Sequence, residues 1–204
     1  MKMDSMKLLN ILAGSPLVNQ LRITIHSLQE AVNRYGEPHR FYHNYDHLLN
    51  LCSQIESSKQ DDLFKDELYL VALYHDVIYD PRSRQNEHRS ARFFQNAVDD
   101  SMYKNRCYTR IFNAILNTTY SFPLNDPCND LSSEFRVMDF GCLYLLSTQE
   151  LVENERLIMK EYQYVSYPEY VEARCGFIEA AIKNASCGYN IDGLRALRQF
   201  VECT

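Results

Sequence analysis

Apolar residues recur at helical spacing along the chain, and no stretch of useful length alternates apolar and polar positions as a half-buried strand would. One such series predicts a helix that begins at Ser15-Pro16 and ends at Gly36. Its apolar positions are Leu17, Leu21, Ile25, Leu28 and Val32. We therefore expect an all-α protein.

Caps and breaks divide the rest of the chain into further helices. Asn44 is the expected cap of the next helix, and Asp61 or Asp62 opens the one after it. That helix should end near Asp80, because Pro81 disfavours the helical conformation of the residue before it. Later helices are expected over about 86–98, 103–118, 132–146, 148–165, 168–184 and 190–202. Asn86 is an expected cap, Ser147 to Glu150 fits a capping box, and residues 81–86 and 120–131 are expected loops.

Length and composition favour one folded domain. The 204 residues are enough for a single hydrophobic core, and no linker divides them, so we predict one domain over residues 1–204. Hydrophobic residues make up 46% of the chain and charged residues 24%, which excludes an intrinsically disordered protein. The net charge of −6 disfavours extended binding to nucleic acid or to an anionic membrane, although a local basic pocket for a phosphate stays open.

Hydropathy and cysteine spacing indicate the cellular compartment and the state of the thiols. The sequence shows no membrane span and no signal peptide, since Asp4 interrupts a short apolar run, so we expect a cytoplasmic protein. Seven cysteines without Cys-x-x-Cys spacing predict free thiols rather than a zinc ribbon or a disulfide framework. Helical surfaces often pair, which leaves a homodimer open, but no heptad run identifies an interface.

Histidines beside apolar runs are the strongest chemical signal. His75-Asp76 follows the run LYLVALY, and a buried carboxylate must be paired or bound to a metal. His43 and His47 lie four residues apart, on one face of a helix. Each signal alone is typical of a hydrogen-bonded core residue. Together, imidazole and carboxylate groups suit one divalent transition metal such as Mn, Fe, Co, Ni or Zn.

Three blocks of sequence give these residues a specific order. They are RFYHNYDH at 40–47, YHDVIYDP at 74–81 and NEHRSA at 86–91. The order resembles the HD superfamily of metal-dependent phosphohydrolases, and most closely a subfamily of short bacterial proteins with R-x-Y-H-x-x-x-H, H-D-x-x-Y-D-P and N-E-x-x-S-A motifs. The resemblance spans roughly residues 40–180. It implies a single-domain HD-type helical bundle.

The resemblance also implies the metal ligands. Carried over position by position, they are His47, His75, Asp76 and Asp139. His43 would lie at the pocket rim, where it either supports the metal ligands or binds a phosphate, while the alternative is a hydrogen bond at the start of a helix. The subfamily commonly has an aspartate where this chain has Val137, so Asp139 alone carries that assignment.

Two acidic residues are candidates to orient or deprotonate the attacking water. Asp80 follows Asp76 by four residues, as in the HD-x-x-E-D pattern of alarmone hydrolases, although Tyr79 replaces the glutamate. Its alternative is a turn aspartate before proline. Glu87 is the second candidate, and its alternative is a first-turn glutamate that the helix dipole favours.

Five further side chains could hold an anionic substrate, although most arginines are merely solvated. They are Arg40, Arg84, Lys160, Tyr162 and Arg174. The subfamily also tends to show a histidine shortly after position 118, where this chain has Thr119, Tyr120 and Ser121. We therefore expect one metal ion rather than two.

The expected function is hydrolysis of a small phosphorylated substrate, with a nucleotide as the choice that the superfamily favours. A bound divalent ion would lower the pKa of its water towards ~7 and polarise a phosphoryl oxygen. Three alternatives stay open. The protein could be an HD-like iron oxygenase, a non-catalytic module that binds metal or nucleotide, or a helical adaptor whose histidines are incidental.

Overall fold

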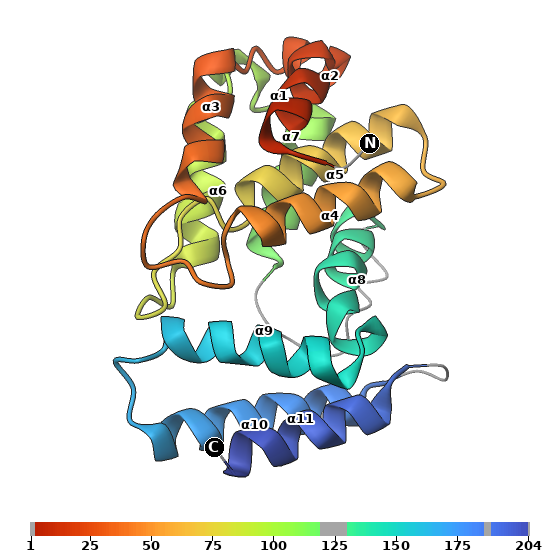
Figure 1. Cartoon of the computed structure of the whole chain (residues 1–204). Helices are drawn as coiled ribbons and strands as arrows, with labels where there is room; N and C mark the ends of the chain where they lie inside the picture. Colours follow the sequence, from red (N-terminus) through yellow and green to blue (C-terminus); the bar gives the residue numbers. More distant parts are fainter. Residues whose placement is uncertain (1–2, 119–129, 186–188, 204) are drawn as a thin grey trace.

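The computed structural model describes residues 3–118, 130–185 and 189–203, and in that part of the chain every regular element is a helix (Figure 1). The α-helices are α1 (Ser5–Gly14), α2 (Pro16–Gln20), α3 (Ile25–Arg34), α4 (Tyr45–Ser57), α5 (Asp62–Tyr74), α6 (Asn86–Ala97), α7 (Arg106–Leu116), α8 (Asp130–Leu145), α9 (Thr148–Glu161), α10 (Tyr167–Lys183) and α11 (Ile191–Cys203). A short 3-10 helix, η1 (Asp100–Met102), precedes α7. The predicted all-α fold is confirmed.

Side-chain caps begin several helices at the predicted positions. The Asn44 side chain accepts a hydrogen bond from the backbone of Asp46 at the start of α4. Asp61 caps α5 in the same way. A complete capping box joins Ser147 and Glu150 at the start of α9. These signals are local, so the sequence alone was enough to identify them.

The prediction of one helix from Pro16 to Gly36 is wrong. The segment is divided into α2 and α3, because Arg22 adopts φ 57°, in the left-handed region. Thr24 then caps a new helix, with its hydroxyl accepting from the backbone of Ser27. Ile25, predicted to be an inward apolar position, is exposed.

Other helix predictions also differ from the structure. α7 begins at Arg106 rather than near 103, and α9 ends at Glu161 rather than near 165. α5 ends at Tyr74 rather than near Asp80. Asn86 is the first residue of α6 rather than its cap. The N-terminal helix α1 was not predicted, although Asp4 caps it through the backbone of Lys7. Most of the loop predicted over 120–131 lies outside the described residues.

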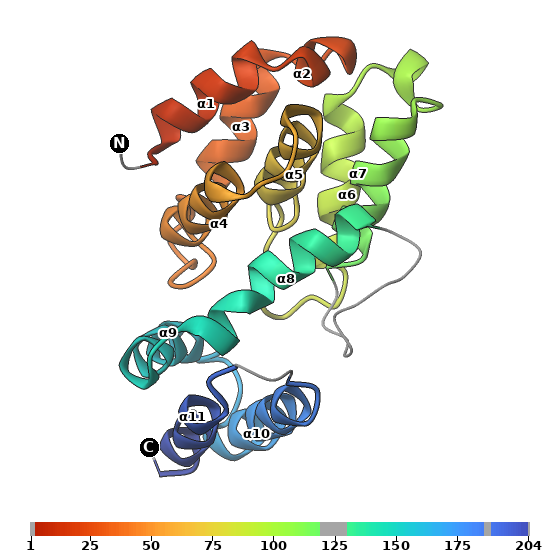
Figure 2. The same cartoon turned by 90° about the vertical axis from the view of Figure 1, so that its right-hand side faces the viewer.

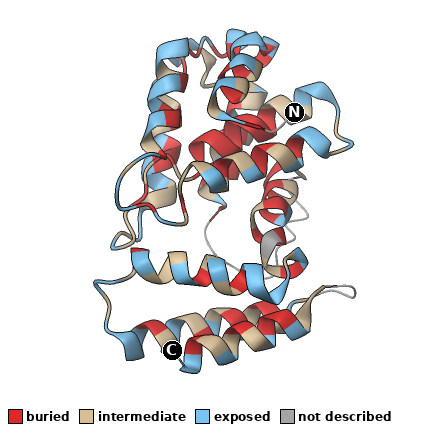
Figure 3. Ribbon diagram, in the orientation of Figure 1, coloured by how far each residue is buried: buried red, intermediate tan, exposed pale blue. Residues whose placement is uncertain are grey.

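Two hydrophobic cores form the interior. The first combines α1 to α7 with the N-terminal part of α8, and α5 lies in its middle, buried from Glu67 to Tyr74 (Figure 3). The second combines the end of α8 with α9, α10 and α11. α8 contributes Phe135 to the first core and Tyr144 to the second, and Figure 2 shows it running from one group of helices to the other. None of the described helices is long and apolar enough to cross a membrane.

Replacement of Arg22 tests the break between α2 and α3. Glycine adopts a left-handed conformation freely, so Arg22→Gly should raise the free energy of unfolding by about 0.5 kcal/mol, net of the entropy it adds to the unfolded chain. Arg22→Val should lower it by about 1 kcal/mol, because a β-branched residue is strained there. Urea denaturation of both variants measures the difference. A valine variant as stable as the glycine variant would contradict the assigned backbone conformation.

Candidate metal centre

Three side chains from three helices of the first core converge on one point. His47 lies in α4, His75 follows α5 and Asp139 lies in α8. Each offers one ligand atom, and these atoms lie within 4.8 Å of one another. The Nε2 atoms of the two histidines are 3.3 Å apart, and His47 Nε2 is 3.4 Å from Asp139 Oδ1. The group is mostly buried, which is the environment of a metal site rather than of a solvated surface cluster.

The orientation of His75 leaves the right nitrogen for a metal. Its Nδ1 donates a hydrogen bond of 2.9 Å to the carbonyl oxygen of Ala72, one turn earlier in α5. In the neutral ring, the proton on Nδ1 leaves a lone pair on Nε2, the atom that faces His47. Metal-ligating histidines are commonly held in this way by a backbone carbonyl. The end of α5 therefore both buries the ring and selects its tautomer.

Asp76 lies beside this group. Its Oδ2 is 3.1 Å from His75 Nε2 and 4.0 Å from His47 Nε2. Burial alone would raise the pKa of Asp76, but the neighbouring His75 outweighs it and holds the pKa well below its ordinary value. Burial would likewise lower the pKa of His75, but Asp76 and Asp139 raise it to about 9. The cluster thus favours positive charge between its carboxylates.

The spacing of these atoms fits a shared ion. Zinc lies about 2.0–2.2 Å from nitrogen and oxygen ligands, so neighbouring ligand atoms lie roughly 3.0–3.4 Å apart at octahedral or tetrahedral angles. The separations of 3.1, 3.3 and 3.4 Å match that spacing, and the distance from His47 Nε2 to Asp76 Oδ2, 4.0 Å, is longer. Two imidazoles with carboxylate oxygens are also a donor set typical of divalent transition metals. The residues present therefore fit a metal ion.

Arg40 fixes the turn that follows His75. Its side chain is fully buried, and its guanidinium donates to the carbonyl oxygens of Asp76 at 2.7 Å and Val77 at 3.0 Å. It also donates to the carbonyl of His43 and forms an ion pair with Glu37. These bonds satisfy backbone carbonyls of the turn after α5 and of the loop before α4. The sequence prediction that Arg40 binds substrate does not match this placement, because Arg40 lies outside the cavity described below.

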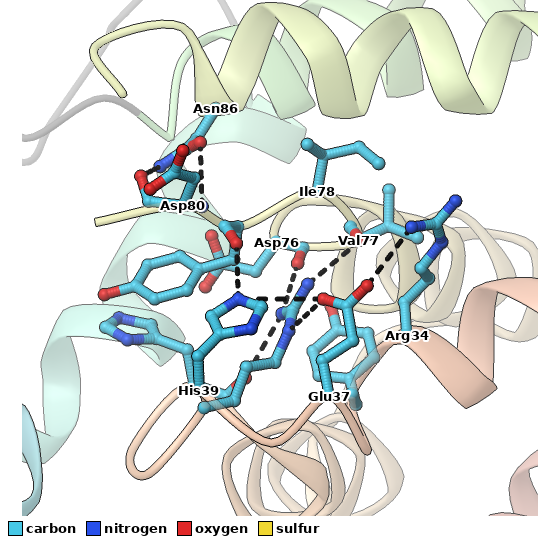
Figure 4. A network of polar contacts seen from close by, with 12 residues as sticks. Arg34, Glu37, His39, Asp76, Val77, Ile78, Asp80 and Asn86 are labelled. Carbon is cyan, nitrogen blue, oxygen red and sulfur yellow. Dashed lines mark hydrogen bonds and ion pairs between the residues drawn. The ribbon is translucent and has the colours of Figure 1, made fainter. Parts of the chain in front are cut away.

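Figure 4 shows the surroundings of this turn. Glu37 lies between Arg34 on one side and His39 on the other, below the backbone of Asp76 and Val77. His39 Nε2 donates to the carbonyl of Tyr79 at 2.8 Å. The loop before α4 and the loop after α5, which carry the two histidine motifs, are thus joined by side-chain to backbone hydrogen bonds.

Glu161, at the end of α9, holds the loop before α4 from the other side. Its Oε1 accepts from the backbone N–H groups of Phe41, Tyr42 and His43, at 2.7–3.0 Å. Its Oε2 accepts from His43 Nδ1 at 2.7 Å and from the Tyr79 hydroxyl at 2.8 Å. Burial alone would raise the pKa of Glu161, but the hydrogen bonds from His43 and the backbone hold it below 4.5.

Sequence reasoning missed Glu161, although one signal was present. A glutamate in the last turn of a helix opposes the helix dipole, so its presence there indicates a specific partner. The prediction instead singled out its neighbours Lys160 and Tyr162. Tyr162 lines the cavity, whereas Lys160 is exposed and lies over the ring of Phe41.

A cavity of about 480 Å³ opens over the candidate metal ligands, between the two cores. Its lining includes all four predicted ligands. Of the other predicted residues, His43, Glu87, Tyr162 and Arg174 line it. Its far side is formed by α9 and α10, with the end of α8. The volume is within the range of about 300–1,000 Å³ that is typical of small-molecule sites.

Asp80 and Arg84 do not line this cavity. Asp80 Oδ1 accepts from the backbone of Arg82, and the Asn86 side chain pairs with the Asp80 backbone (Figure 4). This is the turn role that the sequence left as the alternative. Asp80 lines an adjoining pocket together with Lys160. Arg84 is exposed.

Arg174 faces the cavity but is held by a buried acid. Its Nε and Nη2 lie 2.7–2.9 Å from the carboxylate of Glu155, which is fully buried. The Tyr170 hydroxyl donates to the same carboxylate. The positive charge of Arg174 is therefore largely offset within the second core.

Comparison with protein-family models, with curated proteins and with solved structures finds no match. The function of the site must therefore be inferred from its geometry and chemistry.

Replacement of Arg40 tests its role in fixing the turn. Lysine has no planar fork, so Arg40→Lys should lose most of the bonds to the carbonyls of Asp76 and Val77 and lower the free energy of unfolding by about 2–3 kcal/mol. Arg34→Lys is the control, because Arg34 also pairs with Glu37 but is partly exposed. It should cost at most about 0.5 kcal/mol. Equal losses of unfolding free energy in urea denaturation would mean that the buried hydrogen bonds of Arg40 stabilise the fold no more than the partly exposed ion pair of Arg34.

Replacement of Glu161 tests the contact between α9 and the loop before α4. Glu161→Gln puts an amide group where only acceptors fit, and should lower the free energy of unfolding by about 2–4 kcal/mol at pH 7. Because folding lowers the pKa of Glu161, its stabilising contribution is present above pH 4.5 and is lost as the pH falls through the folded-state pKa. The gap between parent and variant should therefore narrow below pH 4.5.

The control for this variant is Glu150→Gln, on the same helix. Glu150 is exposed, and glutamine also fits a capping box, so the cost should stay below about 0.5 kcal/mol. A difference in unfolding free energy between the parent and Glu161→Gln that stays constant from pH 7 to pH 3.5 would exclude an ionised Glu161 as the source of the stabilisation.

Proposed function

We propose that this protein is a metal-dependent phosphohydrolase of the HD type, which cleaves a small phosphorylated substrate with water. One observation carries the proposal. The ligand atoms of His47, His75 and Asp139 lie within 4.8 Å of one another in the wall of a cavity large enough for a small molecule. The order of these residues along the chain, with Asp76 directly after His75, is the order that the sequence motifs predicted.

His47, His75 and Asp139 would hold the metal, with Asp76 as the fourth ligand. When bound, such an ion lowers the pKa of water towards ~7 and polarises a phosphoryl oxygen. The chain does the rest of the positioning. The hydrogen bond of His75 to Ala72 and that of Arg40 to the Asp76 carbonyl hold His75 and Asp76 in orientation before a metal or substrate binds. This reduces the reorganisation that catalysis requires.

His43 and Glu87 are the residues that we assign to proton transfer. His43 lines the cavity, and its Nδ1 is engaged by Glu161, so Nε2 is the nitrogen that can hydrogen-bond a substrate oxygen. Glu87 lines the same cavity from the first turn of α6 and can orient a water molecule. We give this task to Glu87 rather than to Asp80, because Asp80 lies in the adjoining pocket.

Metal content tests the proposal first. Protein supplied with Mn, Fe, Co, Ni or Zn and then freed of excess metal should hold about one ion per chain by elemental analysis. Asp139→Asn and His47→Ala should hold ten- to a hundredfold less at equal metal concentration. Asp46→Asn is the matched control, because Asp46 is exposed and adjacent to His47, and it should retain the metal.

Catalytic turnover tests the proposed hydrolase activity. The loaded protein should release phosphate from phosphomonoesters, and His43→Ala should reduce kcat by about 10²–10⁴-fold while keeping the metal. A chain that binds none of these metals would overturn the metal centre itself. Metal binding without phosphate release would favour a binding module, and oxygen consumption by the iron form would favour an oxygenase.

A further inference from the structure

The charge of the cavity limits the substrates it can take. Among the described lining residues, the carboxylates are Asp76, Glu87, Asp139 and Glu169, and the sole arginine or lysine is Arg174. Arg174 is already paired with the buried Glu155. The segment from 119 to 129 contains no lysine, arginine or histidine. Beyond the metal and the histidines, little positive charge is available for an anionic ligand.

The helix N-termini at the cavity do not supply this charge. Those of α6 and α10 both reach the lining, and helix N-termini commonly bind phosphate. Each, however, carries a glutamate in its first turn, Glu87 in α6 and Glu169 in α10. Glu169 is engaged by Ser166 in a capping box. These carboxylates complement the helix dipoles and would repel a chain of phosphates.

One part of the cavity wall is apolar. Phe140 and Leu143 of α8, Ile158 of α9 and Phe177 of α10 line it. Leu143, Ile158 and Phe177 are only partly buried, although they pack against the second core. The remaining apolar surface of Leu143 and Ile158 is therefore available to a ligand, and covering it is favourable by the hydrophobic effect. The guanidinium of Arg174 lies 4.7 Å from the centroid of the Phe177 ring, so Phe177 adds a smaller apolar surface.

We propose that the substrate is a phosphomonoester with a single phosphoryl group and an apolar or aromatic body. The phosphoryl group meets the metal centre, and the body packs against Leu143, Ile158 and Phe177. Nucleoside di- and triphosphates are poor ligands because the cavity lacks the cations that would offset their charge. The position of the phosphoryl group rests on the proposed function, whereas the contact with the body does not.

Calorimetric titration of the metal-loaded protein with non-hydrolysable phosphonates tests the substrate class. We expect 1-naphthylmethylphosphonate to bind at least about tenfold more tightly than methylphosphonate, which lacks the apolar body. It should also bind at least about tenfold more tightly than adenosine 5′-(β,γ-imido)triphosphate, supplied as its magnesium complex so that it does not strip the site. A tighter triphosphate, or equal binding of the two phosphonates, would overturn the proposal.

Two leucines in the last turns of α8 provide a matched pair of variants. Leu143 lines the cavity, whereas Leu145 is 73% exposed and lies outside it. Leu143→Ser should weaken naphthylmethylphosphonate binding about tenfold and leave methylphosphonate binding unchanged, while Leu145→Ser should change neither. Metal content should equal that of the parent in both variants, which shows that the site is intact. Equal effects of the two variants on naphthylmethylphosphonate binding would exclude contact between the ligand and the apolar part of the cavity wall.

The two proposals fail in different ways. Binding of 1-naphthol to metal-free protein, weakened by Leu143→Ser, supports the apolar contact even if no metal binds and no ester is cleaved. Hydrolysis of methyl phosphate as fast as 1-naphthyl phosphate at low substrate concentration overturns the substrate class while the hydrolase proposal stands.

Discussion

The carboxylate of Glu161 lies where the two cores of the molecule meet, and the shape of the cavity depends on it. It binds three consecutive backbone N–H groups of the loop before α4, together with His43 and Tyr79. The loop belongs to the half that carries the ligands, and α9 belongs to the half that forms the opposite wall. α8 connects the halves covalently and through its packing. Glu161 adds a contact on the cavity's edge, where burial makes each charge-assisted bond strong.

Buried charge pairs recur throughout this region. Arg40 is paired with Glu37 and with backbone carbonyls, and Arg174 is paired with Glu155. Removing such groups from water costs about as much as their pairing returns. What the pairs do provide is a fixed orientation of the groups around them, and each acts on an element that borders the cavity. The apolar interior of α5 supplies the rigid support behind them.

Local signals were predictable from the sequence, and contacts between distant segments were not. The caps of α4, α5 and α9 follow from a few adjacent residues. The convergence of His47, His75 and Asp139 was predicted from the order of the motifs and the family resemblance that this order implies. The carbonyls of Asp76 and Val77 that Arg40 binds lie 36 and 37 residues from it, and the partners of Glu161 lie up to 120 residues away. Composition and periodicity cannot predict contacts at such separations. Arg22 was missed because nothing in its own chemistry favours a left-handed conformation.

The division of the cavity between two cores has an evolutionary consequence. The candidate ligands all come from α4, the end of α5 and α8, whereas much of the opposite wall comes from α9 and α10. Mutations in the wall can accumulate in descendants of this sequence with little penalty for the ligands, because the two sets pack into different cores. Selection for new substrates can therefore change the residues of the wall, while purifying selection preserves the candidate ligands. The same framework can diversify through substitutions at the lining positions of α9 and α10 alone.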